Sequence, residues 1–499
     1  EEKLHIRELN SFESRVIDTS SEPIGYAWSP DSRQIAVFTR SGIFKSNLTD
    51  GSMVQITRHS TDPGMIGGGW TGDGRIIFAE EGGIRQVSAQ GGTPIDVLTE
   101  SNSEIDFHGP TVIQGTDVIL FVQHNRDQTL VLQAFDGKNR VTITESIEPP
   151  IVECCYSPTG HIIYTRGWAE PSIWAVPFDA AKMRVTGEPF VVLNNASRPS
   201  VSQDGTLVAL RGPGIPAGHI TLIDRDGTIT RMGESQELIA VPTLSNDETR
   251  IAFMTGNDPN KSDIWIYDRT RGTNTRLTFN EMMCMPTGWS PDDSELAVMT
   301  YDTKRVPVLQ TRFYHTDGSG ESRDPIELGL ASFDSNWKWA VTDLDPLSEK
   351  TSIKAVSLER PNEITDVVSL AHLRWQPKLS PSGELLAYTI DDAGRVELYC
   401  TRFPSGQGKW LVTNSSVESM WWSSDSSKIY YLTKDKQLMQ VAVTTEPGIR
   451  FGVPELVVAF PETLSLDFAS ISSTKDDQQF IAVQLDIDES EANRISVIE

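Results

Sequence analysis

The sequence predicts an all-β fold, a β-propeller of about eleven four-stranded blades, from three observations. A Trp-Ser-Pro-Asp phrase at Trp28–Asp31 recurs in varied form about every 45 residues to the end of the chain. A short run with β-branched or aromatic residues follows each copy, as in Gln34–Phe38. No stretch shows a sustained 3.6-residue apolar period, so no long helix is expected.

The copies of the phrase share a Ser or Thr in second place, followed by residues that favour turns. They are Trp28–Asp31, Trp70–Gly74, Tyr156–Gly160, Val201–Gly205, Leu244–Asp247, Trp289–Asp292, Leu379–Gly383 and Trp422–Asp425. Three more hairpins are degenerate, at 110–121, 332–341 and 468–483. Together they give eleven repeats.

Each repeat has a fixed internal order. The phrase forms the turn between the first two strands, because Pro presets φ, Gly tolerates positive φ and Asp caps its own backbone. A third strand follows, as in Asp263–Asp268, and a Gly-containing turn then leads to a polar fourth strand, as in Arg271–Thr278. Four short antiparallel strands per repeat are typical of a propeller blade.

Eleven blades exceed the four to eight of an ordinary ring. We therefore predict two propellers in tandem, residues 1–240 with about five blades plus N-terminal closing strands and residues 241–499 with about six. The alternative is one oversized ring.

The two ends of the chain carry strands without a complete blade. Leu4–Leu9 and Ser14–Asp18 fit a third and a fourth strand, while Arg494–Ile498 fits a third strand that lacks a fourth. Either the N-terminal strands complete a C-terminal blade, which hides both sheet edges, or the chain was cut from a longer protein in mid-blade.

The composition argues against several classes of partner. The 43 basic and 69 acidic residues give a net charge of −26, which disfavours binding to nucleic acid or to anionic lipid. No apolar run reaches the roughly 18 residues of a membrane span, and no signal-peptide pattern is present. We expect the four cysteines to be free thiols, with the adjacent Cys154 and Cys155 on opposite faces of a strand.

Several motifs imitate binding sites. The repeated Asp residues look like catalytic or calcium-binding carboxylates, but an Asp in this place is a turn residue. Asp486–Glu491 lacks the Gly and the final Glu of a calcium loop. Gly67–Gly72 matches a dinucleotide-binding pattern without the helix that it needs, and Ser405–Trp410 is an incomplete P-loop.

Tryptophan and histidine are the remaining candidates. Trp28, Trp70, Trp289 and Trp422 share one position in the repeat, so we interpret them as blade packing. The histidines are dispersed, at His5, His59, His108, His124, His161, His219, His315 and His372. A propeller could bring three of them to a metal ion on its axis, but no pattern selects which three. We therefore predict no catalytic residue, no metal and no cofactor, and the ligand-binding residues stay unknown.

Four stretches carry a resemblance to a known family. They are Gly68–Phe78 with Gly91–Pro94, Trp174–Asp179 with Gly187–Phe190, Asp263–Trp265 with Arg276–Phe279, and Gly408–Trp410 with Trp421–Trp422. In these the chain resembles the TolB-type propeller repeats that follow the membrane segment of bacterial serine/threonine protein kinases and of some winged-helix regulators. No kinase motif is present.

The resemblance implies a non-catalytic sensing or docking module of a bacterial signalling protein. The module would lie on the extracytoplasmic side, tethered by an upstream membrane segment. We expect it to bind a protein, a peptide or a small molecule at a propeller rim or funnel, without nucleic acid and without entering the membrane. The alternative is a propeller enzyme, a lyase or a hydrolase accessory, with an axial metal or His/Arg site.

Overall fold

The structure is a computed structural model of the chain. It describes residues 4–7, 14–17, 23–39, 42–58, 67–80, 82–127, 129–146, 149–168, 170–212, 217–258, 261–279, 282–302, 308–343, 352–361, 363–369, 373–392, 395–460, 471–486 and 494–498. Over these residues the chain forms strands and turns and no α-helix, as the sequence predicts. A membrane-spanning helix is therefore absent from the described part of the chain.

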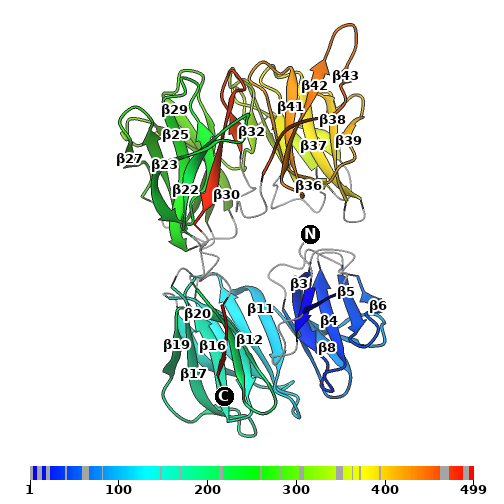
Figure 1. Ribbon diagram of the computed structural model, residues 1–499. Coiled ribbons are helices and arrows are strands. Elements are labelled where there is room, and N and C mark those ends of the chain that lie inside the picture. The colour runs from blue at the N-terminus through cyan, green and yellow to red at the C-terminus, as the bar shows by residue number, and fades with distance from the viewer. Residues whose placement is uncertain are drawn as a thin grey trace. The chain divides into compact units, whose positions relative to one another are not determined.

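The chain divides into two compact units. Unit 1 comprises residues 1–214 and 488–499, and unit 2 comprises residues 215–487. Each unit consists of small antiparallel sheets, most of them with four strands in chain order (Figure 1). The sheets are propeller blades, numbered here 1 to 5 in unit 1 and 6 to 11 in unit 2.

The described residues of unit 1 form five blades and one separate strand pair. Blade 1 is β3 (Pro23–Trp28), β4 (Gln34–Thr39), β5 (Gly42–Asn47) and β6 (Met53–Thr57); blade 2 is β7 (Gly68–Trp70), β8 (Arg75–Glu80), β9 (Gly83–Ser88) and β10 (Ile95–Thr99); blade 3 is β11 (Glu104–Val112), β12 (Ile119–Asn125), β13 (Leu130–Phe135) and β14 (Arg140–Ser146); blade 4 is β15 (Ile151–Ser157), β16 (His161–Arg166), β17 (Ser172–Asp179), β18 (Arg184–Val185) and β19 (Phe190–Asn194); blade 5 is β20 (Ala196–Val201), β21 (Leu207–Arg211) and β47 (Arg494–Ile498); the separate pair is β1 (Leu4–Arg7) and β2 (Ser14–Ile17).

The described residues of unit 2 form six blades. Blade 6 is β24 (Ala240–Leu244), β25 (Arg250–Asp258), β26 (Lys261–Asp268) and β27 (Thr273–Arg276); blade 7 is β28 (Met283–Trp289), β29 (Glu295–Asp302), β30 (Val308–His315) and β31 (Glu321–Ile326); blade 8 is β32 (Ser332–Phe333), β33 (Trp339–Thr342), β34 (Ser352–Ser357) and β35 (Ile364–Ser369); blade 9 is β36 (Leu373–Leu379), β37 (Leu385–Asp392), β38 (Arg395–Arg402) and β39 (Trp410–Thr413); blade 10 is β40 (Val417–Trp422), β41 (Lys428–Thr433), β42 (Gln437–Thr444), β43 (Arg450–Phe451) and β44 (Glu455–Ala459); blade 11 is β45 (Ser472–Ser473), β46 (Gln479–Leu485), β22 (Ala217–Asp224) and β23 (Ile229–Glu237).

The first strand of each blade is the innermost one. In unit 1 the first strands of successive blades, β3, β7, β11, β15 and β20, each contact the next. The second strands are the most apolar, because they face neighbouring blades on both sides: β4, β8 and β29 are almost wholly buried along their described side chains. Burial on both faces is why a single blade cannot fold alone and must stack in a ring.

Unit 2 closes its ring by joining the two ends of its own chain. In blade 11, β22 pairs with β23 on one edge and with β46 on the other, from Gly218 opposite Leu485 to Asp224 opposite Gln479. One face of this blade packs Phe480 against Trp421 and Tyr430 of blade 10. The other face packs Ile481 into the same core cluster as Ile251 of blade 6, so every blade of unit 2 has two neighbours.

The eleven predicted hairpins are present, but the structure divides the chain elsewhere than at residue 240. Residues 217–237, expected in the first propeller, form β22 and β23 of unit 2. The pairing of β22 with β46 places them there. Residues 494–498, expected in the second propeller, form β47 and pair with β21 of unit 1. Unit 2 is therefore inserted in the last blade of unit 1 rather than following it.

The strands at the two ends of the chain have incomplete sheets in the described residues. β47 is a third strand without a fourth, as predicted. β1 and β2 pair with each other, and no described C-terminal strand joins them, so the described residues do not show them completing a C-terminal blade. They pack on blade 1, where Ile17 meets Ile35 and Val37.

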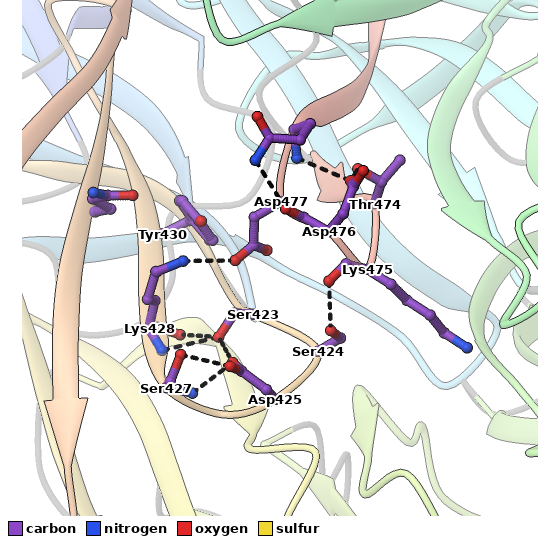
Figure 2. A network of polar contacts seen from close by, with 12 residues as sticks. Ser423, Ser424, Asp425, Ser427, Lys428, Tyr430, Thr474, Lys475, Asp476 and Asp477 are labelled. Carbon is purple, nitrogen blue, oxygen red and sulfur yellow. Dashed lines mark hydrogen bonds and ion pairs between the residues drawn. The ribbon is translucent and has the colours of Figure 1, made fainter.

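A polar network joins blade 10 to blade 11 where the ring of unit 2 closes. Figure 2 shows the ammonium of Lys428, at the start of β41, beside the carboxylate of Asp477 in the β45–β46 turn, at 2.9 Å. Arg225, in the turn after β22, donates to the backbone oxygen of Asp477 at 2.6 Å and to the hydroxyl of Tyr430 at 2.9 Å. The hydrogen bond from Lys428 to Asp477 raises the pKa of the lysine.

We predict that the fragment 215–487 folds on its own and that the fragment 241–499 does not. The first keeps β22 and β23, whereas the second leaves an edge of β46 unpaired and removes Ile220 from the core cluster that blade 11 shares with blade 6. Size-exclusion chromatography and thermal unfolding followed by circular dichroism would show a monodisperse, cooperatively unfolding 215–487 fragment. Cooperative unfolding of 241–499 instead would contradict the division described here.

We also predict that Asp477→Asn lowers the free energy of unfolding of unit 2 by about 1 to 3 kcal/mol, because it leaves the half-buried Lys428 without its anion. Asn tolerates the positive φ of 58° at this position, so the turn is kept. The matched control is Lys182→Met in unit 1, which removes an exposed ion pair at 3.0 Å. Its effect in urea unfolding should stay within about 0.5 kcal/mol.

Candidate functional site

The repeated Ser-x-Asp phrase is a self-capped turn and not a site. In blade 10, Ser423 Oγ donates to Asp425 Oδ1 at 2.7 Å, the Ser427 amide donates to the same oxygen at 2.9 Å, and the Lys428 amide donates to Ser423 Oγ at 2.9 Å. The Ser or Thr hydroxyl is bonded to the Asp in the same way in six other turns, at Ser29/Asp31, Thr71/Asp73, Ser202/Asp204, Ser245/Asp247, Ser290/Asp292 and Thr474/Asp476. The interpretation of these carboxylates as turn residues is confirmed.

These hydrogen bonds hold the carboxylates in their charged form. The hydroxyl bond and the backbone amide lower the pKa of Asp204, Asp292 and Asp425 to about 2. A carboxylate with so low a pKa is a poor general acid or base near neutral pH.

The other motifs that imitate binding sites are also structural where they are described. Gly68 and Gly69 lie in β7, which a strand and not a helix follows, and a Cβ on Gly68 would collide with the ring of Phe38 in blade 1. Asp486 accepts a hydrogen bond from Nδ1 of His219 at 2.8 Å and another from Ser235. The rest of the acidic stretch that begins at Asp486, residues 487–491, lies outside the described residues.

The cysteines are free thiols, as expected. Cys154 packs into the core between blades 3 and 4, whereas Cys155 packs on the opposite face toward blade 5. Burial raises the pKa of Cys155 and of Cys400 to about 12, so neither thiol is poised as a nucleophile.

Of the four tryptophans that share one position in the repeat, three are buried and one is exposed. Trp70, Trp289 and Trp422 are 4 %, 6 % and 7 % exposed, which confirms them as blade packing. Trp28, at the same position in blade 1, is 42 % exposed, and its neighbour Tyr26 on the same strand is 54 % exposed. Here the interpretation as buried packing is wrong.

The buried tryptophans all pack on the blade that precedes their own. The indole N–H of Trp289 donates to the backbone oxygen of Thr243 in β24, and that of Trp422 donates to Lys378 in β36, both at 2.9 Å. Each acceptor lies on the innermost strand of the preceding blade. In unit 1 the sheet before blade 1 is the β1–β2 pair, which has no innermost strand among the described residues.

Unit 2 shows what covers this position when the sheet is complete. There the strand that follows the closing strands is β24, and Leu244 stands where Trp28 stands in the repeat. β24 lies against β45 and β46, and Leu244 packs into the cluster that contains Ile481 and Val483. In unit 1 no described strand takes the place that β45 and β46 take in unit 2, beside β1 and against the face of β3 that exposes Tyr26 and Trp28. We call this place the open blade position.

A second unusual feature is a polar cluster on the two inner strands of blade 3. Asp106 and His108 lie on β11, and His124 lies on β12 directly opposite Asp106. Oδ1 of Asp106 is 2.7 Å from Nε2 of His108 and 3.4 Å from Nδ1 of His124. The three ligand atoms lie within 4.8 Å of one another, so they could hold a metal ion.

The cluster is partly shielded from solvent, and the two histidines stabilise the charged form of the Asp106 carboxylate. Burial alone would raise the pKa of the Asp106 carboxyl, but the hydrogen bonds from His108 and His124 lower it well below its usual range. The imidazole rings of the two histidines meet edge to face, with centroids 5.7 Å apart.

Sequence reasoning missed this cluster. It allowed for histidines converging on an axis but could not select His108 and His124, and it did not consider Asp106 at all. The signal was the alternation Asp106-Phe107-His108 near the start of a strand, with His124 near the end of the strand that pairs with it. The pattern indicates a cluster only once the register between these two degenerate strands is known, because the register places His124 opposite Asp106. Of the other histidines, His59 and His372 lie outside the described residues.

Comparison with known proteins gives structural similarity alone. No protein-family model and no curated protein matches the chain. Among solved structures, a TolB from Agrobacterium tumefaciens is 13 % identical over 54 % of this chain and 98 % of that chain, with a TM-score of 0.40. The β-propeller domain of the Trilobed protease from Pyrococcus furiosus is 12 % identical over 62 % of this chain and 98 % of that chain, with a TM-score of 0.35. The propeller fold itself rests on the sheets described above.

We predict that Ser423→Ala raises the pKa of Asp425 from about 2 toward the ordinary 3.8, because it removes the largest stabilising hydrogen bond of the carboxylate. Carboxylate titration by NMR would measure the change. With the pKa depressed in the folded state, the turn contributes stability above the unfolded pKa and loses it as the pH falls toward about 2. The variant should therefore show a weaker loss of stability over that range, and an unchanged Asp425 titration would contradict the capping role.

Proposed function

We propose that the chain is a non-catalytic binding module that docks a partner protein by accepting the partner's β-hairpin in the open blade position of unit 1. One observation carries the proposal: Trp28 is 42 % exposed at a position where the other three tryptophans of the repeat are covered by the preceding blade.

The open blade position offers both kinds of contact that strand addition uses. β1 pairs with β2 alone among the described strands, and within that part of the chain its other edge offers backbone donors and acceptors to an added strand. Beside it, Tyr26 and Trp28 present a large aromatic surface, and such residues dominate the energy of protein interfaces. The rest of blade 1 is tightly packed, so little conformational entropy is lost when a partner binds there.

The hairpin of unit 2 indicates what the partner must supply. β46 turns Ile481 and Val483 to blade 6 and Phe480 and Ala482 to blade 10. We expect the partner's hairpin to alternate in the same way, with β-branched residues on the face toward Trp28. The net charge of −26 on the chain favours basic residues elsewhere on the partner.

The cellular setting is part of the same proposal. The likeness of the repeats to those that follow membrane segments in bacterial kinases and winged-helix regulators supports a sensing or docking module on the extracytoplasmic side. The partner would then be a protein of that compartment or of the cell envelope.

A second candidate function, a propeller enzyme with an axial site, is favoured by Asp106, His108 and His124. Asp106 and His108 lie on the innermost strand of blade 3, the strand nearest to where an axial site would be, and His124 lies on the strand beside it. A lyase acting on acidic sugars would release an unsaturated product. Release by the wild type and not by Asp106→Asn would support this function over docking.

A hairpin-peptide display library selected on the full chain tests the docking proposal. We expect the selected peptides to alternate apolar residues and to lose at least about 10-fold in affinity on Trp28→Lys, because a central aromatic anchor contributes this much or more. The matched control is Phe279→Lys in unit 2, which changes another exposed aromatic residue, 73 % exposed. Peptides that bind Trp28→Lys as well as the wild type, or a selection that yields none, would overturn the proposal.

A further inference from the structure

The polar cluster of blade 3 goes beyond the docking function and stands independently of it. We propose that Asp106, His108 and His124 form a binding site for one divalent ion of the late first transition series, with Zn²⁺ as the best fit.

The strand register builds the site. Asp106 and His124 are cross-strand partners, so their side chains leave the sheet on the same face. His108 is two residues from Asp106 and shares that face, while Phe107 between them packs with Phe121 on the other face, 5.0 Å between ring centroids. Three donor groups therefore converge without any loop to position them, and a site on paired strands is rigid.

The distances suit a small ion. A tetrahedral site with metal–ligand bonds of about 2.0 to 2.2 Å places its ligand atoms about 3.3 Å from one another. Oδ1 of Asp106 lies 2.7 and 3.4 Å from the two histidine nitrogens, on either side of that value. All three atoms lie within 4.8 Å, so small rotations of the rings would complete the geometry.

The donor set selects the class of metal. Imidazole nitrogen suits zinc, copper, iron and nickel, whereas calcium and magnesium take oxygen ligands. Two nitrogens and one carboxylate oxygen are a common set for zinc with one coordination position left open. Burial also matters: His108 is buried, so an ion here has lost part of its hydration and binds the protein more strongly.

The residues around the three ligands form an apolar wall on one side and leave the other side open to solvent. Val122 and Leu130 lie beside the site and belong to the core between blades 3 and 4. Asp127 lies in the turn after β12, near enough to His124 for an electrostatic interaction, and adds negative charge near the site. The side chain of Asp106 is 43 % exposed, so solvent reaches the ion at that side. A water molecule or a donor atom of a small ligand would take the open position.

Zinc titration of the metal-free full chain by isothermal calorimetry tests the proposal, together with the visible spectrum of the Co²⁺ form. We expect one ion per chain, and cobalt bands typical of tetrahedral coordination. Asp106→Asn and His124→Ala should each weaken zinc binding by more than about 100-fold, since even loss of an outer-shell partner costs 10- to 100-fold. Zinc should also raise the thermal midpoint of the wild type and not of these variants.

The matched control is His219→Ala in unit 2. It removes a buried His–Asp pair of 2.8 Å, the same chemistry without a third ligand, and should leave zinc affinity within about 2-fold. Circular dichroism of each variant shows whether it is folded, and Asp106→Asn, which keeps the size of the side chain, decides the question where an alanine variant unfolds. No stoichiometric binding, binding unchanged by Asp106→Asn, or binding lost in His219→Ala would each overturn the site.

Discussion

The requirement that a ring of blades must close underlies every other feature of this protein. A blade buries both faces of its second strand, so a blade at an open end would expose a wholly apolar sheet. Unit 2 meets the requirement with seven residue pairs between β22 and β46, strands that are more than 250 residues apart in sequence. The polar contacts of Lys428, Arg225 and Asp477 lie at the same junction and fix the β45–β46 turn against its neighbour.

In unit 1 the described strands do not close the ring. The β1–β2 pair occupies the place that β22 and β23 occupy in unit 2, and it packs on the next blade in the same manner. No described strand takes the place of the two inner strands of this sheet. Tyr26 and Trp28 on β3, which such strands would cover, are exposed. Comparison of the two units thus relates the exposure of Trp28 to the two inner strands that unit 2 has at this place and that the described part of unit 1 does not show.

Local signals in the sequence were sufficient for the repeated parts of the fold. Ser423 and Asp425 form the predicted turn because their hydrogen bonds span only a few residues, and the same holds at the other copies. The division between the units was not predictable in this way, because β47 fits a third strand equally well in either unit and only its pairing with β21 decides. The Asp106, His108 and His124 cluster depends on a register between two degenerate strands, for which the sequence carries no turn signal of the repeated type.

The insertion of unit 2 into blade 5 has a consequence for how the chain is made. β21 ends at Arg211 and its partner β47 begins at Arg494, so about 280 residues of translation separate the two strands of one sheet. At 5 to 20 residues per second the ribosome needs about 15 to 60 s for that stretch, far longer than β-hairpins take to form. Unit 2 can therefore fold completely while the edge of β21 still waits for its partner. During synthesis that edge can pair with a strand of another chain, so it is a place where a chaperone would protect the nascent protein.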